Sequence, residues 1–114
     1  MDILKIYEKV NLKVPLEQRR FINYYNDTVD ELMTMHPDFV LIDDIAYKPA
    51  TNVHDDCLVR DLYIPPIVDN IIFLAGADKD GTYKTEFLRK AQLAYNKYWH
   101  DGSKNHHVKR MGWI

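Results

Sequence analysis

Residues 64–99 read IPPIVDNIIFLAGADKDGTYKTEFLRKAQLAYNKYW and contain two segments of helical periodicity. The first, Pro66 to Ala75, is apolar around more than half of its circumference, which predicts a helix buried on several sides. The second, Thr82 to Trp99, carries one apolar stripe, made of Phe87, Ala91, Ala94, Tyr95 and Tyr98. A short polar connector that begins and ends with glycine separates the two segments. This pattern predicts an antiparallel helical hairpin.

Proline and glycine mark the expected ends of both helices. Pro65 and Pro66 suit a first turn, because proline fixes φ and the N–H groups of that turn lack helical partners. Gly76 stands where a left-handed residue closes a helix, and Gly102 predicts the end of the second helix. We expect Trp99 to lie in the core, so that Trp99→Ala would cost on the order of 3 kcal/mol. An unchanged denaturation midpoint would instead make Trp99 an outward-facing interface anchor.

The N-terminal third predicts two further helices. Asp2 is a candidate cap for a short helix that ends near Asn11. Pro15 opens a longer helix that reaches about Met35 and stops at His36, because a residue before proline is pushed out of the helical region. The fold class is therefore mainly α, a small bundle of about four helices in a chain of 114 residues. We divide it into a helical domain, residues 1–102, and an extended basic and aromatic C-terminal tail, residues 103–114.

The central segment, residues 43–62, has no sustained period. The apolar run before it, Phe39 to Ile42, predicts either a short strand or an extended arm packed on the helices. Loops of this length are uncommon in compact domains and are often functional or ordered by a partner. We therefore expect a neighbouring subunit to contact this segment, with candidate interface residues Asp43, Asp44, Asp55 and Asp56.

Charge is distributed unevenly along the chain. Residues 1–78 carry 7 Lys and Arg against 14 Asp and Glu, net −7, whereas residues 79–114 carry 8 against 3, net +5. Opposite charges suit subunits that dock on one another or on a charged partner, although the two halves can also neutralise each other within one monomer. The basic tail ends in large apolar side chains and is expected to dock on a partner. Its candidate interface residues are Lys104, Lys109, Arg110, Met111, Trp113 and Ile114.

Catalytic, cofactor and metal patterns are weak. The run His54 to Cys57 holds side chains that can bind zinc or iron, but neighbouring side chains point apart, so an acidic loop is favoured over a metal-dependent enzyme. The single cysteine excludes an intramolecular disulfide and favours a reducing compartment. The N-terminus lacks a secretory pattern, and the longest apolar block is too short to span a membrane. We predict no enzyme, no cofactor and no membrane contact.

Basic residues of the last helix favour one alternative function, a small helical DNA-binding regulator. Lys84, Arg89, Lys90 and Lys97 lie off the apolar stripe and precede the basic tail, and a helix-turn-helix places such a helix in the major groove. Against this, the connector is longer than the usual turn of that motif, and the whole chain has a net charge of −2.

Two spaced motifs support a family resemblance: Tyr63-x-Pro65-Pro66-x-Val68-x-Asn70-Ile71-x-Phe73-Leu74-Ala75 and Phe87-x-x-Lys90-Ala91-x-x-Ala94-Tyr95-x-x-Tyr98-Trp99. Together they resemble the C-terminal helical pair of small tailed-bacteriophage head-to-tail connector proteins, also called adaptor or neck proteins. The run Glu17-Gln18-Arg19-Arg20-Phe21-Ile22-Asn23 resembles the start of the longer N-terminal helix in the same proteins. The likeness covers roughly residues 1–100.

This resemblance implies an α-helical virion structural protein. The subunit would assemble as a homo-oligomeric ring, dodecameric by the family likeness, beneath the portal protein. The ring would link head to tail, continue the DNA channel with non-specific contact to the packaged DNA, and bind other neck or tail-completion proteins. The implied location is the neck of the virion, after synthesis in the host cytoplasm. As a monomer we expect residues 43–62 and 103–114 to be mobile, and in a ring we expect both to be ordered.

Overall fold

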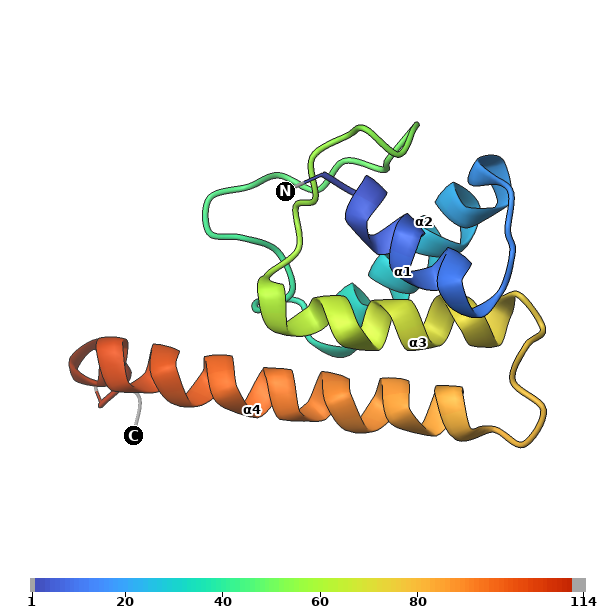
Figure 1. The fold of residues 1–114 in the computed structure, drawn as a ribbon. Coiled ribbons are helices and arrows are strands. Elements are labelled where there is room, and N and C mark those ends of the chain that lie inside the picture. Colours follow the sequence, from blue (N-terminus) through green and yellow to red (C-terminus); the bar gives the residue numbers. More distant parts are fainter. Residues whose placement is uncertain (1, 112–114) are drawn as a thin grey trace.

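The computed structural model describes the backbone of residues 2–111 and the side chains of residues 2–100. The described chain forms four α helices and one short 3-10 helix: α1 (Leu4–Lys13), α2 (Gln18–Met35), η1 (Asp61–Tyr63), α3 (Ile64–Leu74) and α4 (Thr82–Met111). Figure 1 shows α3 running between α4 on one side and α1 and α2 on the other. The predicted mainly helical bundle of about four helices is confirmed.

The helix α3 lies at the centre of the fold. It contacts α1, α2 and α4, and its side chains Ile67 and Ile71 are fully buried. This explains why its sequence is apolar around most of the circumference. Pro65 and Pro66 stand in its first turn, and Gly76, just past its end, has the positive φ of +84° that favours glycine. The predicted helical hairpin of α3 and α4 is confirmed.

The helix α4 packs on α3 through the predicted stripe. Phe87, Ala91 and Ala94 are buried. The helix continues through Gly102, where the sequence predicted its end, so the expected domain boundary falls inside α4. A glycine inside a helix costs only about 1 kcal/mol relative to alanine, and no proline follows it in this chain. Four candidate interface residues lie in the part of α4 where only the backbone is described: Lys104, Lys109, Arg110 and Met111. The other two of the tail, Trp113 and Ile114, lie outside the described residues.

The ends of α1 and α2 differ in detail from expectation. Ile3, not Asp2, occupies the cap position of α1, without a side-chain capping hydrogen bond. Asp2 instead forms an isolated antiparallel bridge with Asp56, which lies far away in the sequence. The helix α1 extends to Lys13, and α2 begins at Gln18, after Pro15. The predicted stop of α2 before His36 is confirmed.

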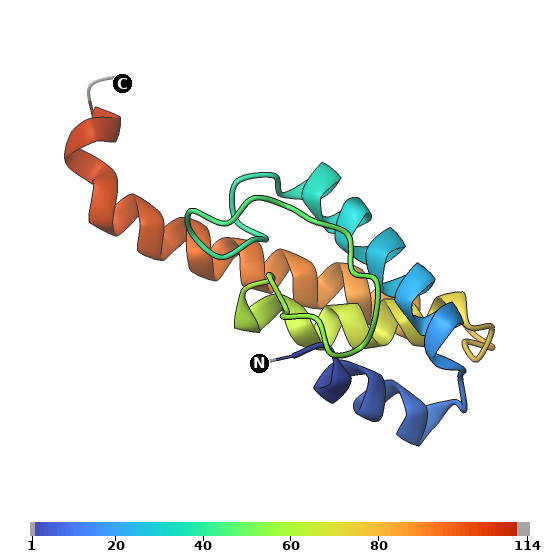
Figure 2. The same ribbon diagram turned by 90° about the horizontal axis from the view of Figure 1, so that it is seen from above.

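The segment from residue 36 to residue 60 contains no regular helix or strand. The run Phe39–Ile42 is not a strand: Phe39 lies in a turn, Val40 in a bend, and Leu41 forms an isolated antiparallel bridge with Val59. We call this irregular run the arm. Figure 2 shows this segment as a wide loop spread over the helices. It is nevertheless part of the core, because six of its side chains are buried: His36, Val40, Ala50, Val53, Cys57 and Val59.

Candidate functional site

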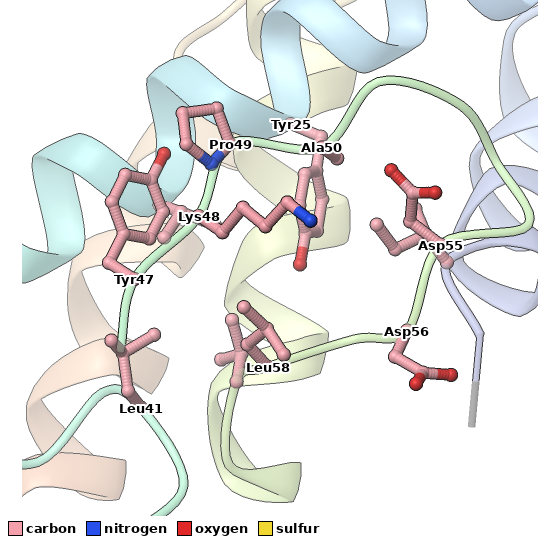
Figure 3. Close-up of a pocket in the computed structure, with 12 residues that line it drawn as sticks. Tyr25, Leu41, Tyr47, Lys48, Pro49, Ala50, Asp55, Asp56 and Leu58 are labelled. Carbon is pink, nitrogen blue, oxygen red and sulfur yellow. The ribbon is translucent and has the colours of Figure 1, made fainter. Parts of the chain in front are cut away.

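A pocket of about 220 Å³ lies between α2 and the central segment (Figure 3). Its polar lining includes the phenols of Tyr25 and Tyr47. The Tyr25 hydroxyl lies 3.7 Å from the sulfur of Cys57, and burial, followed by this neighbour, raises the pKa of Tyr25 far above its usual value. Burial and the nearby Asp30 carboxylate raise the pKa of Tyr47 to about 12. Both phenols therefore stay protonated at neutral pH and can serve this pocket as hydrogen-bond donors.

Asp55 also lines this pocket, but its carboxylate is used within its own loop. It accepts hydrogen bonds from the N–H groups of Thr51 (2.7 Å) and Asn52 (3.3 Å) and from the Thr51 hydroxyl (3.1 Å). These bonds hold the pKa of Asp55 below its usual value. Asp55 therefore stabilises the fold of the loop. The other ionisable side chains that line the pocket are Lys48, Asp56 and the two phenols.

The residues of the candidate metal run separate in space. Cys57 is buried beside Tyr25, whereas His54 is exposed. In the part of the chain that the structure describes, no three His, Cys, Asp or Glu side chains gather as a group that could hold a metal ion.

The acidic candidates divide into two groups. Asp55 and Asp56 border the pocket, whereas Asp43 and Asp44 lie at the end of the arm, where Asp43 pairs with Arg60. Asp44 has a φ of +62°, a backbone conformation that aspartate tolerates better than most residues. On either side of this pair, Ile42 is 44% exposed and Ile45 is 39% exposed. We call the four residues Ile42–Asp43–Asp44–Ile45 the acidic tip.

An apolar groove opens between α4 on one side and η1 with the first turn of α3 on the other. It encloses about 460 Å³ and is lined by Leu62, Pro65, Lys90, Leu93, Ala94 and Lys97, and we call this set the apolar groove. Leu93 is 54% exposed. Sequence reasoning missed this site. The available signal was Leu93 itself, an apolar residue that stands off the stripe facing α3.

Three of the four basic residues proposed for DNA binding pair with acids of the same chain. The Lys84 ammonium lies 2.8 Å from Glu31 of α2, and the Lys90 ammonium lies 2.8 Å from Asp69 of α3. Arg89 donates two hydrogen bonds to Glu86, one turn earlier on α4. Part of the charge separation in the sequence is therefore neutralised within the monomer, which was the alternative to docking between subunits.

Trp99 does not occupy the buried position expected from the sequence. It is 40% exposed and meets the ring of Phe39 edge-on, with centroids 6.0 Å apart. The N–H of Leu62, two residues before α3 begins, donates to the Tyr98 hydroxyl (3.2 Å), so α4 runs past the start of α3 at this point. The hairpin partner that would cover Trp99 has already ended, which explains its exposure.

No protein-family model, curated protein or solved structure matches this chain. None of the helices within residues 2–111 is both long and apolar enough to cross a membrane. The surfaces described above and the residue motifs therefore indicate the function.

Proposed function

We propose that this protein is a structural subunit of a tailed-phage virion. It forms a homo-oligomeric ring in the neck, below the portal protein, links head to tail and continues the DNA channel. The observation that supports this best is the apolar groove, which leaves Leu62 and Leu93 exposed on an otherwise well-packed helical body. Exposed apolar patches rimmed by polar residues mark protein contact sites. The connector-like motifs indicate the kind of assembly.

The shape of the molecule also suits assembly. The molecule measures 50 × 31 × 19 Å. At 1.5 Å per residue, the 30 residues of α4 span about 45 Å and the 11 residues of α3 about 16 Å. Figure 1 shows the last turns of α4 extending beyond the start of α3. A helix that projects from the body can reach a neighbouring copy, the portal, or another neck or tail-completion protein.

The alternative, a small helical DNA-binding regulator, has weaker support. Its proposed recognition helix uses Lys84, Arg89 and Lys90 in pairs with acids of the same chain, and each pair would have to break to contact phosphate. Contact with packaged DNA in our proposal is non-specific and secondary. The proposal assigns the chain no catalytic step and no cofactor.

Assembly with the portal tests this function. The chain is purified alone and with the portal protein encoded beside its gene, and each sample is examined by native mass spectrometry and negative-stain electron microscopy. We expect a ring of many copies that binds the portal oligomer. A chain that stays monomeric and does not bind the portal would refute the proposal. Sequence-specific gel shifts with a steep salt dependence would favour the regulator instead.

A further inference from the structure

The outer face of α1 carries three lysines. Lys5, Lys9 and Lys13 follow one another at intervals of four residues, so they lie on one side of the helix, about 6 Å apart along its axis. All three are exposed, whereas Ile6 and Val10 of the same helix are fully buried. We call these three lysines the lysine face.

The charge of the lysine face is not used within the described part of the chain. Lys84, Arg89 and Lys90 of α4 all pair with acids, but among the side chains of residues 2–100 no acid forms an ion pair with the lysine face. The helix α1 contains one acid, Glu8, and three lysines against one glutamate give it a formal charge of +2. A positive patch therefore stands within residues 1–78, whose net charge is −7.

The composition of this face suits a polyanion better than a protein partner. Protein interfaces are enriched in aromatic side chains and depleted of lysine. None of the exposed residues of α1 is aromatic, and Leu12, which is 86% exposed, is the one large apolar residue among them. Lysine ammonium groups contact phosphate as point charges, and phosphate contacts carry no sequence information. The lysine face is therefore suited to a phosphate backbone of any sequence.

The length and position of the lysine face also suit contact with DNA. From Lys5 to Lys13 the helix rises about 12 Å, a length over which one strand of B-DNA presents about three to four phosphates. Figure 1 shows α1 on the side of α3 remote from α4. The helix α4 carries the exposed Leu93 and the projecting end assigned above to contacts with other subunits. Contacts made there leave the lysine face accessible.

We propose that the lysine face of α1 lines the channel of the ring and binds the phosphate backbone of the packaged DNA. This inference rests on the proposed function and names the surface through which the subunit contacts DNA. It places that contact on α1 and not on α4, where the sequence suggested a basic surface. Electrostatic contacts that do not depend on sequence let DNA slide along a protein, as passage through a channel requires.

Salt-dependent binding of random-sequence duplex DNA to the ring tests this contact. Lys5→Gln with Lys9→Gln should weaken binding at least about fivefold near 0.1 M salt, and should reduce the salt slope by about two for each subunit that contacts DNA. The matched control is Lys48→Gln with Lys79→Gln, because these two lysines are exposed outside α1, and it should leave both quantities unchanged. Circular dichroism melts confirm that every variant is folded. Equal effects from the two double variants would contradict the inference.

Two further variants of α1 separate DNA from a protein partner. Glu8→Gln removes the one acid of the helix and should strengthen DNA binding at least about twofold, whereas Leu12→Ser should leave it unchanged. If the Lys5 and Lys9 double variant and Leu12→Ser both lose portal binding while DNA binding is unchanged, the face binds a protein and the inference is wrong. Rings that bind the portal but not DNA would overturn the inference and leave the proposed function standing. Wild-type chains that never form rings would refute the proposed function, and the channel contact with it.

Discussion

The side-chain amide of Asn70 donates a hydrogen bond to the hydroxyl of Thr28, with an Nδ2–Oγ1 distance of 2.9 Å, and both side chains are fully buried. The Thr28 hydroxyl donates in turn to the Tyr24 carbonyl (2.7 Å). The Asn70 carbonyl oxygen accepts a bond from Lys84 (3.1 Å), which also pairs with Glu31. One polar network thus connects α2, α3 and α4. Because its buried groups are paired, it stabilises one specific arrangement of the three helices.

Loss of this network should be costly. Asn70→Ala is expected to lower the free energy of unfolding by about 2–3 kcal/mol, because it removes a buried amide and leaves a small cavity. Urea denaturation at neutral pH measures this. Asn96→Ala is the control, since Asn96 is exposed and bonds only along α4 to Gln92, and it should change stability by less than about 0.5 kcal/mol. Equal effects from the two variants would show that the network does not stabilise the fold.

Two aromatic residues of α4 should respond differently to truncation. Phe87 is fully buried, so Phe87→Ala should cost about 3–5 kcal/mol. Trp99→Ala should cost only about 1–2 kcal/mol, because 40% of the side chain already faces solvent. Denaturant midpoints of the two variants, compared with wild type, decide the matter. A Trp99→Ala loss as large as that of Phe87→Ala would restore the core position expected from the sequence.

Local signals account for what could be predicted of the fold. The hairpin follows from apolar periodicity, from Pro65 and Pro66 at a helix start and from Gly76 at a helix end, and all of these act within a few residues. The errors arise from distant partners. Asp2 does not cap α1 because its backbone pairs with Asp56. Trp99 is not buried because α3, which would pack against it, begins at Ile64 and does not reach that far along α4.

The candidate site was harder to predict for the same reason. Leu93 is one exposed leucine in the sequence, and single exposed leucines are common. It becomes part of a groove only where the chain brings Leu62 and Pro65 beside it. Likewise, Lys84 and Lys90 read as a solvent-facing basic surface until the packing of α4 places Glu31 and Asp69 opposite them. Asp43 and Asp44 are exposed, and their role in an interface stays a prediction, whereas Asp55 is used within its own loop.

The stability of the protein should fall in mildly acidic solution because of His36. Its ring is buried beside the Tyr63 hydroxyl, and burial lowers the pKa of His36. The folded state then binds fewer protons than the unfolded state, in which the pKa is about 6.5. Stability is fully present above that pH and declines as the pH falls below it, by at most about 1.4 kcal/mol per pH unit.

Urea titrations between pH 7.5 and 5 measure this slope, and His36→Phe should flatten it. Among the side chains that the structure describes, three carboxylates have pKa values lowered in the fold: Asp55, Asp80 and Glu86. They lose their contributions to stability only near pH 4 and below, outside this window. Parallel slopes for wild type and His36→Phe would mean that His36 takes up its proton without cost in the folded state.

Asn26 of α2 should control how often the central segment opens. Its side-chain amide donates to the Ala50 carbonyl (2.9 Å) and accepts from the Ala50 N–H (2.9 Å). These two hydrogen bonds attach the backbone of the central segment to α2. Cys57 belongs to the same segment and is buried beside Tyr25 of α2, so the rate at which a thiol reagent labels it reports opening. Asn26→Ala removes two hydrogen bonds worth about 1 kcal/mol each, and labelling of native protein should accelerate at least about tenfold.

Asn23→Ala, an exposed neighbour on α2, should leave the labelling rate unchanged. If wild-type monomer labels as fast as urea-unfolded chain, the segment is mobile before assembly, as the sequence predicts for residues 43–62. Slow labelling of the monomer, together with acceleration in Asn26→Ala, would mean that α2 holds the segment closed. The acidic tip would then keep its shape in the monomer, before any assembly.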